Sequence, residues 1–244
     1  MIIDKKEGFV YNFIFLIGLI IVPSLVTGPF VADLIVSLSS IFFIYLLYKK
    51  KVKIYLNSFY IKLSIIWFIY IILNSLFSSN ILISLESSLF YIRFFLFSLL
   101  ILYFIKKNQK YLIYTFNIIL ITMCILIFDS FFQYIFDYNL IGFNKHVRVT
   151  SFFYKEEVLG GYLSRLFPYF LSIYLFINNQ KIKNNYFTLI IFYALLIISI
   201  FIAGERSGVV YVFISSLLIF FLLDLKKIQL IAVGITIFLY ICIN

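Results

Sequence analysis

The chain has 244 residues, of which 64% are hydrophobic and only 12% are charged, and its mean hydropathy is +1.12. Soluble domains are about half apolar and about a quarter charged, so this composition excludes an ordinary soluble domain. The net charge of +10 comes from short basic clusters between apolar runs, which leaves no basic face for a nucleic acid.

Each apolar run is about twenty residues long, the length that carries a helix through a ~30 Å hydrocarbon core. The runs do not alternate between apolar and polar residues, as the ~10-residue strands of a membrane β-barrel would. The sequence therefore predicts an all-α, polytopic membrane helix bundle that forms a single transmembrane domain over residues 1–244. The nine predicted spans are 9–27, 30–48, 63–79, 87–105, 111–136, 157–177, 186–203, 209–223 and 228–243.

The connecting segments alternate in charge, and this alternation predicts the orientation. Every lysine except Lys145 and Lys155 lies at the N-terminus or in the segments 49–62, 106–110, 181–183 and 226–227. Cytoplasmic loops carry the excess of positive residues, so we expect these segments and the N-terminus to be cytoplasmic. The segments 78–86, 137–156 and 204–208 are then expected on the outer side.

The chain has four arginines, and none falls in a predicted cytoplasmic segment. Arg148 and Arg206 lie in outer loops, whereas Arg165 and Arg93 lie ~12 Å and ~9 Å inside predicted spans at 1.5 Å per residue. Arginine offers a planar, always-charged fork that binds phosphate in a bidentate way, which lysine does not. The four therefore indicate a site for a lipid-linked phosphate or pyrophosphate at the outer leaflet. The alternative is that they extend to the interface or pair with acids.

Acidic residues are predicted at a similar depth. Asp129 lies ~10 Å from the outer end of its span and shares a helical face with Thr122, Gln133 and Asp137. It is a candidate for substrate binding or for neutralising Arg93 or Arg165. On the next span, a stripe of small and polar residues suits either a site or close helix packing. That stripe contains Glu157, Gly160, Gly161, Ser164, Arg165 and Pro168.

The sequence contains few residues that could bind a metal or act as a nucleophile. His146 is the one histidine, so no multi-histidine metal site is expected, and a lone loop histidine is more often a bystander than a base. Cys124 and Cys242 both fall in apolar runs, which suits small core residues better than a disulfide. No nucleotide-binding loop, catalytic triad or zinc motif occurs, so we expect neither a metal nor a cofactor.

Two stretches resemble the superfamily of O-antigen ligases and O-antigen polymerases. The first is HVRVTSFFYKEEVLGGYLSRLFPYFL at 146–171, in which an outer arginine precedes a turn and then a helix rich in Gly, Leu and Pro. The second is FIAGERSGVVYVFISSLLIFFL at 201–222, in which a short Gly- and Ser-containing turn around an arginine joins two spans. The resemblance covers about residues 145–223.

The resemblance implies a multi-span, metal-independent glycosyltransferase in the bacterial inner (cytoplasmic) membrane. Such enzymes move a glycan from undecaprenyl pyrophosphate, on the periplasmic face, to lipid A–core or to a second lipid-linked repeat unit. This chemistry belongs to the biosynthesis of lipopolysaccharide or surface polysaccharide. By this resemblance, Arg148 and Arg206 hold the pyrophosphate and stabilise its charge as it departs. From its place beside Arg206, Glu205 is expected either to orient that guanidinium or to be a solvated neighbour.

The sequence departs from the family in one respect. Members usually continue into a large periplasmic loop, which carries a histidine in the ligases, and this sequence ends before such a loop. His146 does not match that position, and we expect an N-terminal fragment of a family member. The alternatives are a flippase for lipid-linked oligosaccharides or another transporter, and an assembly factor without chemistry. Transporters usually show repeated halves and a site at the midplane, and neither is visible here.

Overall fold

A computed structural model describes residues 5–49, 59–145, 147–154, 156–177 and 186–222. Its ordered elements are all helical, and the described residues contain no β-strand beyond an isolated bridge between Tyr138 and Asn144. The helices are α1 (Lys5–Thr27), α2 (Pro29–Tyr48), α3 (Phe59–Leu76), α4 (Ile81–Phe90), α5 (Ile92–Lys107), α6 (Lys110–Phe136), the short 3-10 turn η1 (Ser151–Phe153), α7 (Leu159–Ile177), α8 (Tyr186–Ile202) and α9 (Arg206–Leu222). The predicted all-α class is therefore confirmed.

Three helical segments are long and apolar enough to cross a membrane: Pro29–Tyr48, Ile81–Lys107 and Lys110–Phe136. They correspond to the second, fourth and fifth predicted spans. Four shorter apolar helices lie at Tyr11–Thr27, Ile61–Leu76, Phe187–Ile202 and Arg206–Ile219. These helices indicate a membrane protein. The ninth predicted span, 228–243, lies outside the described residues.

The fourth helix begins earlier than predicted. It starts at Ile81 rather than at 87, and the predicted outer segment 78–86 is mostly helical. Backbone hydrogen bonds begin the helix here, since the Ser84 N–H donates to the carbonyl of Asn80 at 3.1 Å. The hydroxyls of Ser87 and Ser88 donate to the carbonyls of Ile83 and Leu85, so these serines are satisfied within the helix.

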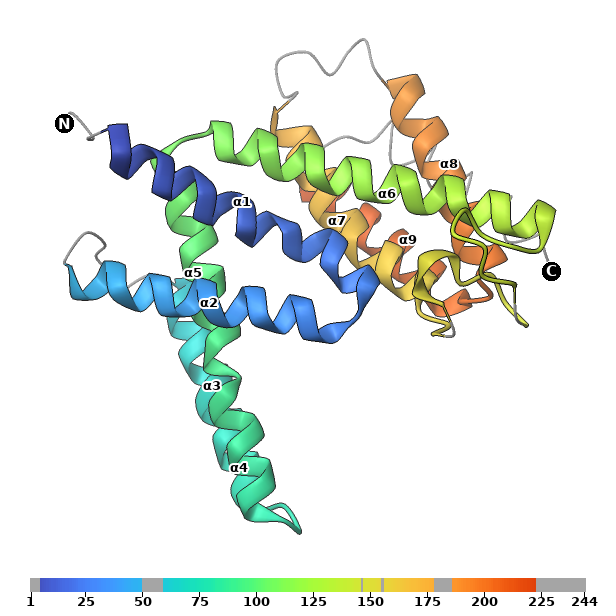
Figure 1. Cartoon of the computed structure of the whole chain (residues 1–244). Coiled ribbons are helices and arrows are strands. Elements are labelled where there is room, and N and C mark those ends of the chain that lie inside the picture. The colour runs from blue at the N-terminus through green and yellow to red at the C-terminus, as the bar shows by residue number, and fades with distance from the viewer. Residues whose placement is uncertain (1–4, 50–58, 146, 155, 178–185, 223–244) are drawn as a thin grey trace. The chain divides into compact units, whose positions relative to one another are not determined.

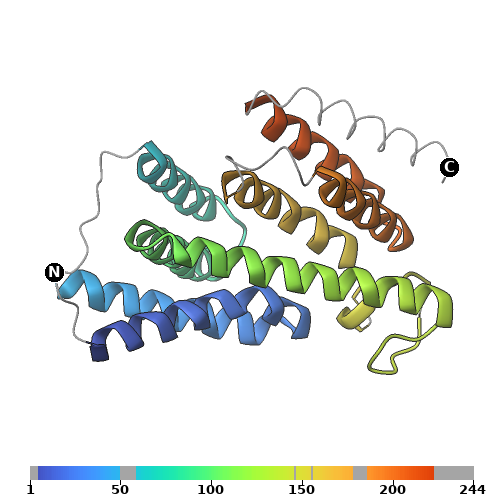
Figure 2. The same cartoon turned by 90° about the horizontal axis from the view of Figure 1, so that it is seen from above.

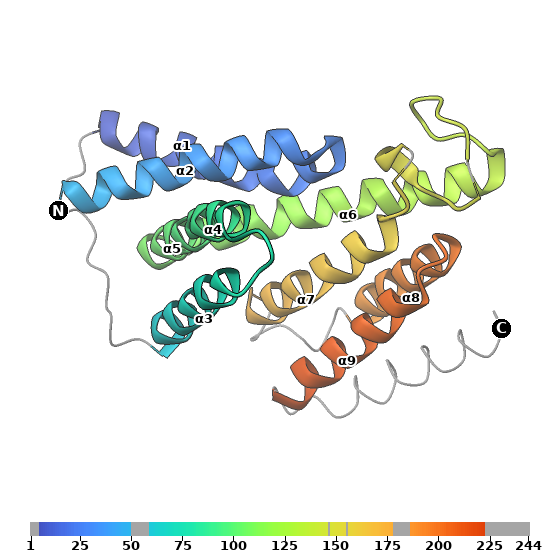
Figure 3. The same cartoon turned by 90° about the horizontal axis from the view of Figure 1, so that it is seen from below.

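The chain divides into two compact units, residues 1–111 and 112–244. The prediction of a single transmembrane domain over 1–244 is not tested by this division. In the first unit, α1 lies beside α2, and α5 packs across α2 (Figures 1 and 3). The core there is aromatic: Phe15 contacts the rings of Phe104 and Tyr111 at centroid distances of 5.3 and 4.4 Å. The α3 and α4 helices pair and extend away from the crossing of α2 and α5 (Figure 1).

In the second unit, α7 packs against both α8 and α9, which also contact each other (Figure 2, gold, orange and red). The rings of Phe116 on α6 and Phe170 on α7 stack at 5.4 Å. The buried face of α7 includes Leu159, Leu163 and Phe167. This amphipathic pattern fixes which side of α7 faces its neighbours.

Glycine allows α7 and α9 to approach each other closely. A Cβ placed on Gly208 would lie 3.2 Å from the carbonyl oxygen of Gly160 and 3.0 Å from Cγ2 of Ile200. A Cβ placed on Gly160 would lie 2.8 Å from Cβ of Glu205, a carbon that moves only with its backbone. The α7–α9 contact therefore requires these glycines.

We expect Gly160→Ala to destabilise the chain by about 1–3 kcal/mol, the usual cost of overpacking. Gly18→Ala is the matched control in α1, where the new Cβ would meet Ile101 and Phe97 at 3.4 and 3.5 Å, ordinary contact distances. Alanine is also the better helix former, so this control should melt at or above the parent temperature. Thermal melting in detergent compares them, and equal melting of the two variants would contradict the prediction.

Candidate functional site

The C-terminal end of α6 anchors the loop that follows it. Asp129 is fully buried, and its two carboxylate oxygens accept hydrogen bonds from the Leu140 N–H at 2.8 Å and the Ser151 hydroxyl at 2.5 Å. One turn further along, Gln133 Oε1 accepts from the N–H groups of Thr150 and Ser151 at 2.9 and 2.7 Å. These contacts hold the start and the end of the loop against α6.

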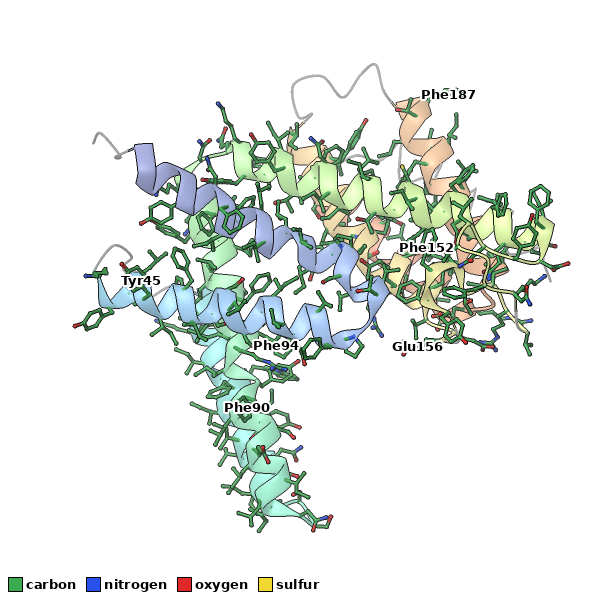
Figure 4. The ribbon with its side chains drawn as sticks, in the orientation of Figure 1. Tyr45, Phe90, Phe94, Phe152, Glu156 and Phe187 are labelled. Atoms are coloured by element: carbon green, nitrogen blue, oxygen red, sulfur yellow. The ribbon has the colours of Figure 1, made fainter. Side chains whose placement is uncertain are left out.

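Asn139 completes this anchor, and the sequence did not single it out. Its side-chain oxygen accepts from the N–H groups of Ile141 and Phe143, and its amide donates to the carbonyl of Ser151 at 2.9 Å. It is fully buried. An asparagine shortly after the end of an apolar run is the signal that points to such a turn. Figure 4 labels Phe152 and Glu156 in the second half of this loop.

The anchored loop positions Arg148. Its guanidinium lies 3.4 Å from a carboxylate oxygen of Glu157, and its side chain crosses Gly204. A Cβ on Gly204 would lie 3.0 Å from both Cδ and Nε of Arg148. Gly204 also has φ +74°, a conformation that other residues rarely adopt. Glycine at 204 therefore serves both the turn and the contact with Arg148.

Glu205 turns toward α7. Its carboxylate packs against Gly160 and Gly161 in the first turn of that helix, and a Cβ on Gly161 would lie 2.9 Å from Oε2. Its other oxygen, Oε1, is buried and has no hydrogen-bond partner among the described residues. The positive end of the α7 dipole favours a carboxylate there. Among the described residues no ion pair joins Glu205 to Arg206, so the expectation that Glu205 orients this guanidinium finds no support.

Arg206 is the first residue of α9, and its side chain is exposed. It follows Gly204 by two residues, and Arg148 lies on Gly204 through space. The two arginines that resemble the family's pair therefore both lie at the turn between α8 and α9, Arg148 through its contact with Gly204 and Arg206 at the positive end of a helix. Among the described residues Arg206 has no ion pair, whereas Arg148 has Glu157.

Arg165 separates from the residues that were predicted to share its stripe. Gly160 and Ser164 are buried on α7, whereas Arg165 is exposed on another side of that helix, as is Tyr169. Residues 160 and 165 are five positions apart, or about 140° around a helix with 3.6 residues per turn. Arg165 therefore does not lie on the buried face of α7 that contains Gly160 and Ser164.

The predicted polar face of α6 is present over most of its length. Thr122, Asp129 and Gln133 are all buried. Asp137 leaves this face, because α6 ends at Phe136 and Asp137 has φ +61°. Its exposed carboxylate pairs with Lys145 at 3.4 Å. Asp129 binds groups of the loop rather than an arginine, which favours a structural role.

Arg93 belongs to the first unit. It follows Ile81 by twelve residues, about 18 Å along the helix and about twice the predicted depth. Its guanidinium contacts the Asp33 carboxylate on α2 at 3.0 Å, and its carbonyl accepts from the Ser40 hydroxyl at 2.6 Å. The acid that pairs with Arg93 is therefore Asp33, not Asp129.

His146 and Lys155 lie outside the described residues. Within the described ranges, no three His, Cys, Asp or Glu side chains cluster as metal ligands would. Comparisons of the chain with protein families, with characterised proteins and with solved structures gave no match.

Proposed function

We propose that this chain binds undecaprenyl pyrophosphate at the outer face of the bacterial cytoplasmic membrane. The proposed activity is transfer of the attached glycan, as in O-antigen ligation or polymerisation. The observation that carries this proposal is the contact of the Arg148 side chain with Gly204, which precedes the exposed Arg206 by two residues. The two stretches that resemble the O-antigen ligase and polymerase superfamily contain these same arginines.

The charges around the turn suit a pyrophosphate. Glu205 packs against the first turn of α7, whose dipole offsets part of its charge. Arg148 shares its charge with Glu157 at 3.4 Å, a distance long enough for an anion to compete. Arg206 has its charge available and lies at a helix N-terminus, where backbone N–H groups also favour anions. We therefore assign most of the pyrophosphate binding to Arg206 and a smaller part to Arg148.

In the proposed reaction, an acceptor hydroxyl attacks the anomeric carbon of the glycan. The hydroxyl oxygen forms the new glycosidic bond as the bond from that carbon to the pyrophosphate oxygen breaks. The electron pair of the broken bond leaves with the pyrophosphate, and the hydroxyl proton passes to that pyrophosphate or to water. Arginines positioned on that group stabilise the charge that develops there. The acceptor in this proposal is lipid A–core or a second lipid-linked repeat unit.

The proposal includes nine spans with a cytoplasmic N-terminus, supported by the alternation of lysines along the sequence. We expect a cysteine placed in 49–62 to resist a membrane-impermeant thiol reagent in intact cells, and one placed in 137–145 to react. Both variants carry Cys124→Ser and Cys242→Ser, so that only the new thiol reports. Labelling of the 49–62 position in intact cells would refute this orientation.

Lipid binding tests the function directly. The purified chain in lipid nanodiscs is titrated with undecaprenyl pyrophosphate and, separately, with undecaprenyl phosphate. We expect tighter binding of the pyrophosphate, because a second phosphate adds acceptors for a second guanidinium fork. Equal affinity for the two lipids would refute the proposal. If the chain moved a lipid-linked glycan across the bilayer of proteoliposomes without transferring the glycan to an acceptor, a flippase would be favoured.

A further inference from the structure

The first unit carries a groove along α3 and the junction of α4 and α5. The groove encloses about 570 Å³ and is mostly apolar. Its lining includes Leu63, Ile66, Trp67, Tyr70, Tyr91 and Phe95. The side chain of Trp67 is 59% exposed. A groove of this kind on a membrane-embedded helix pair suits a hydrocarbon chain.

A polar pocket adjoins this groove. It encloses about 440 Å³ and is lined by Glu86, Ser87, Phe90, Tyr91, Arg93 and Phe94. Tyr91 lines both cavities and lies at the short break between α4 and α5. Figure 4 labels Phe90 and Phe94 on either side of this break. The groove and the polar pocket therefore share one lining residue. An apolar groove beside a pocket with charged side chains matches a lipid, in which a hydrocarbon tail is joined to a polar headgroup.

The charges at the polar pocket specify the headgroup. Arg93 contacts Asp33 at 3.0 Å, and its other terminal nitrogen makes only a long hydrogen bond of 3.5 Å to Ser37. Glu86 is exposed and has no ion pair among the described residues. The three charged groups therefore sum to one excess negative charge. Leaving an exposed carboxylate unpaired in a membrane helix is costly, so a cationic group at Glu86 would stabilise it.

We propose that this site binds a zwitterionic phospholipid with a primary ammonium headgroup, such as phosphatidylethanolamine. The ammonium pairs with Glu86, the phosphate lies against the weakly held nitrogen of Arg93, and one acyl chain fills the groove at Trp67. Phosphatidylglycerol brings a phosphate without a cation and adds to the excess negative charge. The charge count therefore selects a zwitterion over an anionic lipid. A primary ammonium is favoured over choline, because it has N–H donors for the Glu86 carboxylate and a quaternary nitrogen has none. This inference does not depend on the proposed glycan transfer.

The chain supplies its own probe, because Trp67 is the only tryptophan in the sequence. The purified chain is placed in nanodiscs of phosphatidylcholine that contain equal small fractions of phosphatidylethanolamine and phosphatidylglycerol. In one preparation the ethanolamine lipid carries brominated acyl chains, which quench tryptophan, and in the other the glycerol lipid carries them. We expect the brominated ethanolamine lipid to quench Trp67 about two- to fivefold more effectively, the preference that an exposed charge pair provides.

Glu86→Gln removes the charge that attracts the ammonium while nearly keeping the side-chain shape. In this variant the two brominated lipids should quench Trp67 equally. Asp137→Asn, a matched control in the second unit, should keep the stronger quenching by the ethanolamine lipid. Thermal melting of each variant verifies that it is folded. Equal quenching of the parent by the two lipids would overturn the proposal, and so would a preference that survives Glu86→Gln.

Discussion

Arg206→Lys is expected to weaken the binding of undecaprenyl pyrophosphate by about tenfold to 100-fold. Lysine keeps the positive charge but loses the planar fork that donates two parallel hydrogen bonds to a phosphate. A hydrogen bond to a charged group contributes about 1.5–3 kcal/mol, and each 1.4 kcal/mol is about a factor of ten in affinity. Titration of the nanodisc-embedded chain with the lipid measures this change.

Two variants make this result interpretable. Lys145→Arg changes a basic residue of the loop after α6 that pairs with Asp137, so it should bind the lipid as the parent does. Arg148→Lys should weaken binding less than Arg206→Lys, because Arg148 already shares its charge with Glu157. If Arg206→Lys binds undecaprenyl pyrophosphate as tightly as the parent, charge alone suffices, and the bidentate role of Arg206 is wrong.

The helices of this protein could be predicted from local signals, because runs of about twenty apolar residues specify helices without knowledge of their neighbours. The ends of the helices were harder to predict where polar residues occur inside a helix. The segment 78–86 contains three serines and was predicted as a loop, yet the helix starts at Ile81, and Ser87 and Ser88 bond back to the α4 backbone. Sequence polarity does not distinguish a hydroxyl that faces a loop from one that bonds to its own helix.

Partners of the charged residues could not be predicted for a related reason. Depth along separate spans suggested that Asp129 neutralises Arg93 or Arg165, but pairing depends on which helices touch. The packing of α2 against α5 pairs Arg93 with Asp33. By contrast, Gly204 and Arg206 are only two residues apart, so their proximity follows from the sequence itself. The contact of Arg148 with Gly204 depends on the folded loop after α6 and was not predicted, since the resemblance implied only that Arg148 and Arg206 hold one pyrophosphate.

Asp129→Ala is expected to destabilise the second unit by about 3 kcal/mol or more and to release the loop after α6. The substitution leaves the Leu140 N–H and the Ser151 hydroxyl without their buried acceptor, and each hydrogen bond to a charged group contributes about 1.5–3 kcal/mol. Ser151 also has φ +52°, an unfavourable conformation that these bonds maintain. Thermal melting in detergent and the rate of proteolysis within 137–158 measure the two effects.

Asp137→Asn is the matched control, since it removes a carboxylate charge from the same end of α6 and asparagine tolerates the φ of +61° at this position. Asp137 is exposed and makes one ion pair of 3.4 Å, so its loss should cost at most about 1 kcal/mol.

Asp129→Asn separates a structural role from a requirement for charge. Its amide oxygen can still accept from Leu140, and its amide nitrogen can donate to the Ser151 oxygen, so it should retain most of the stability lost in Asp129→Ala. Equal melting of Asp129→Ala and the parent would show that Asp129 does not anchor the loop. If Asp129→Asn stayed folded but lost binding of undecaprenyl pyrophosphate, the negative charge itself would be required, and a role in the lipid site would replace the purely structural one.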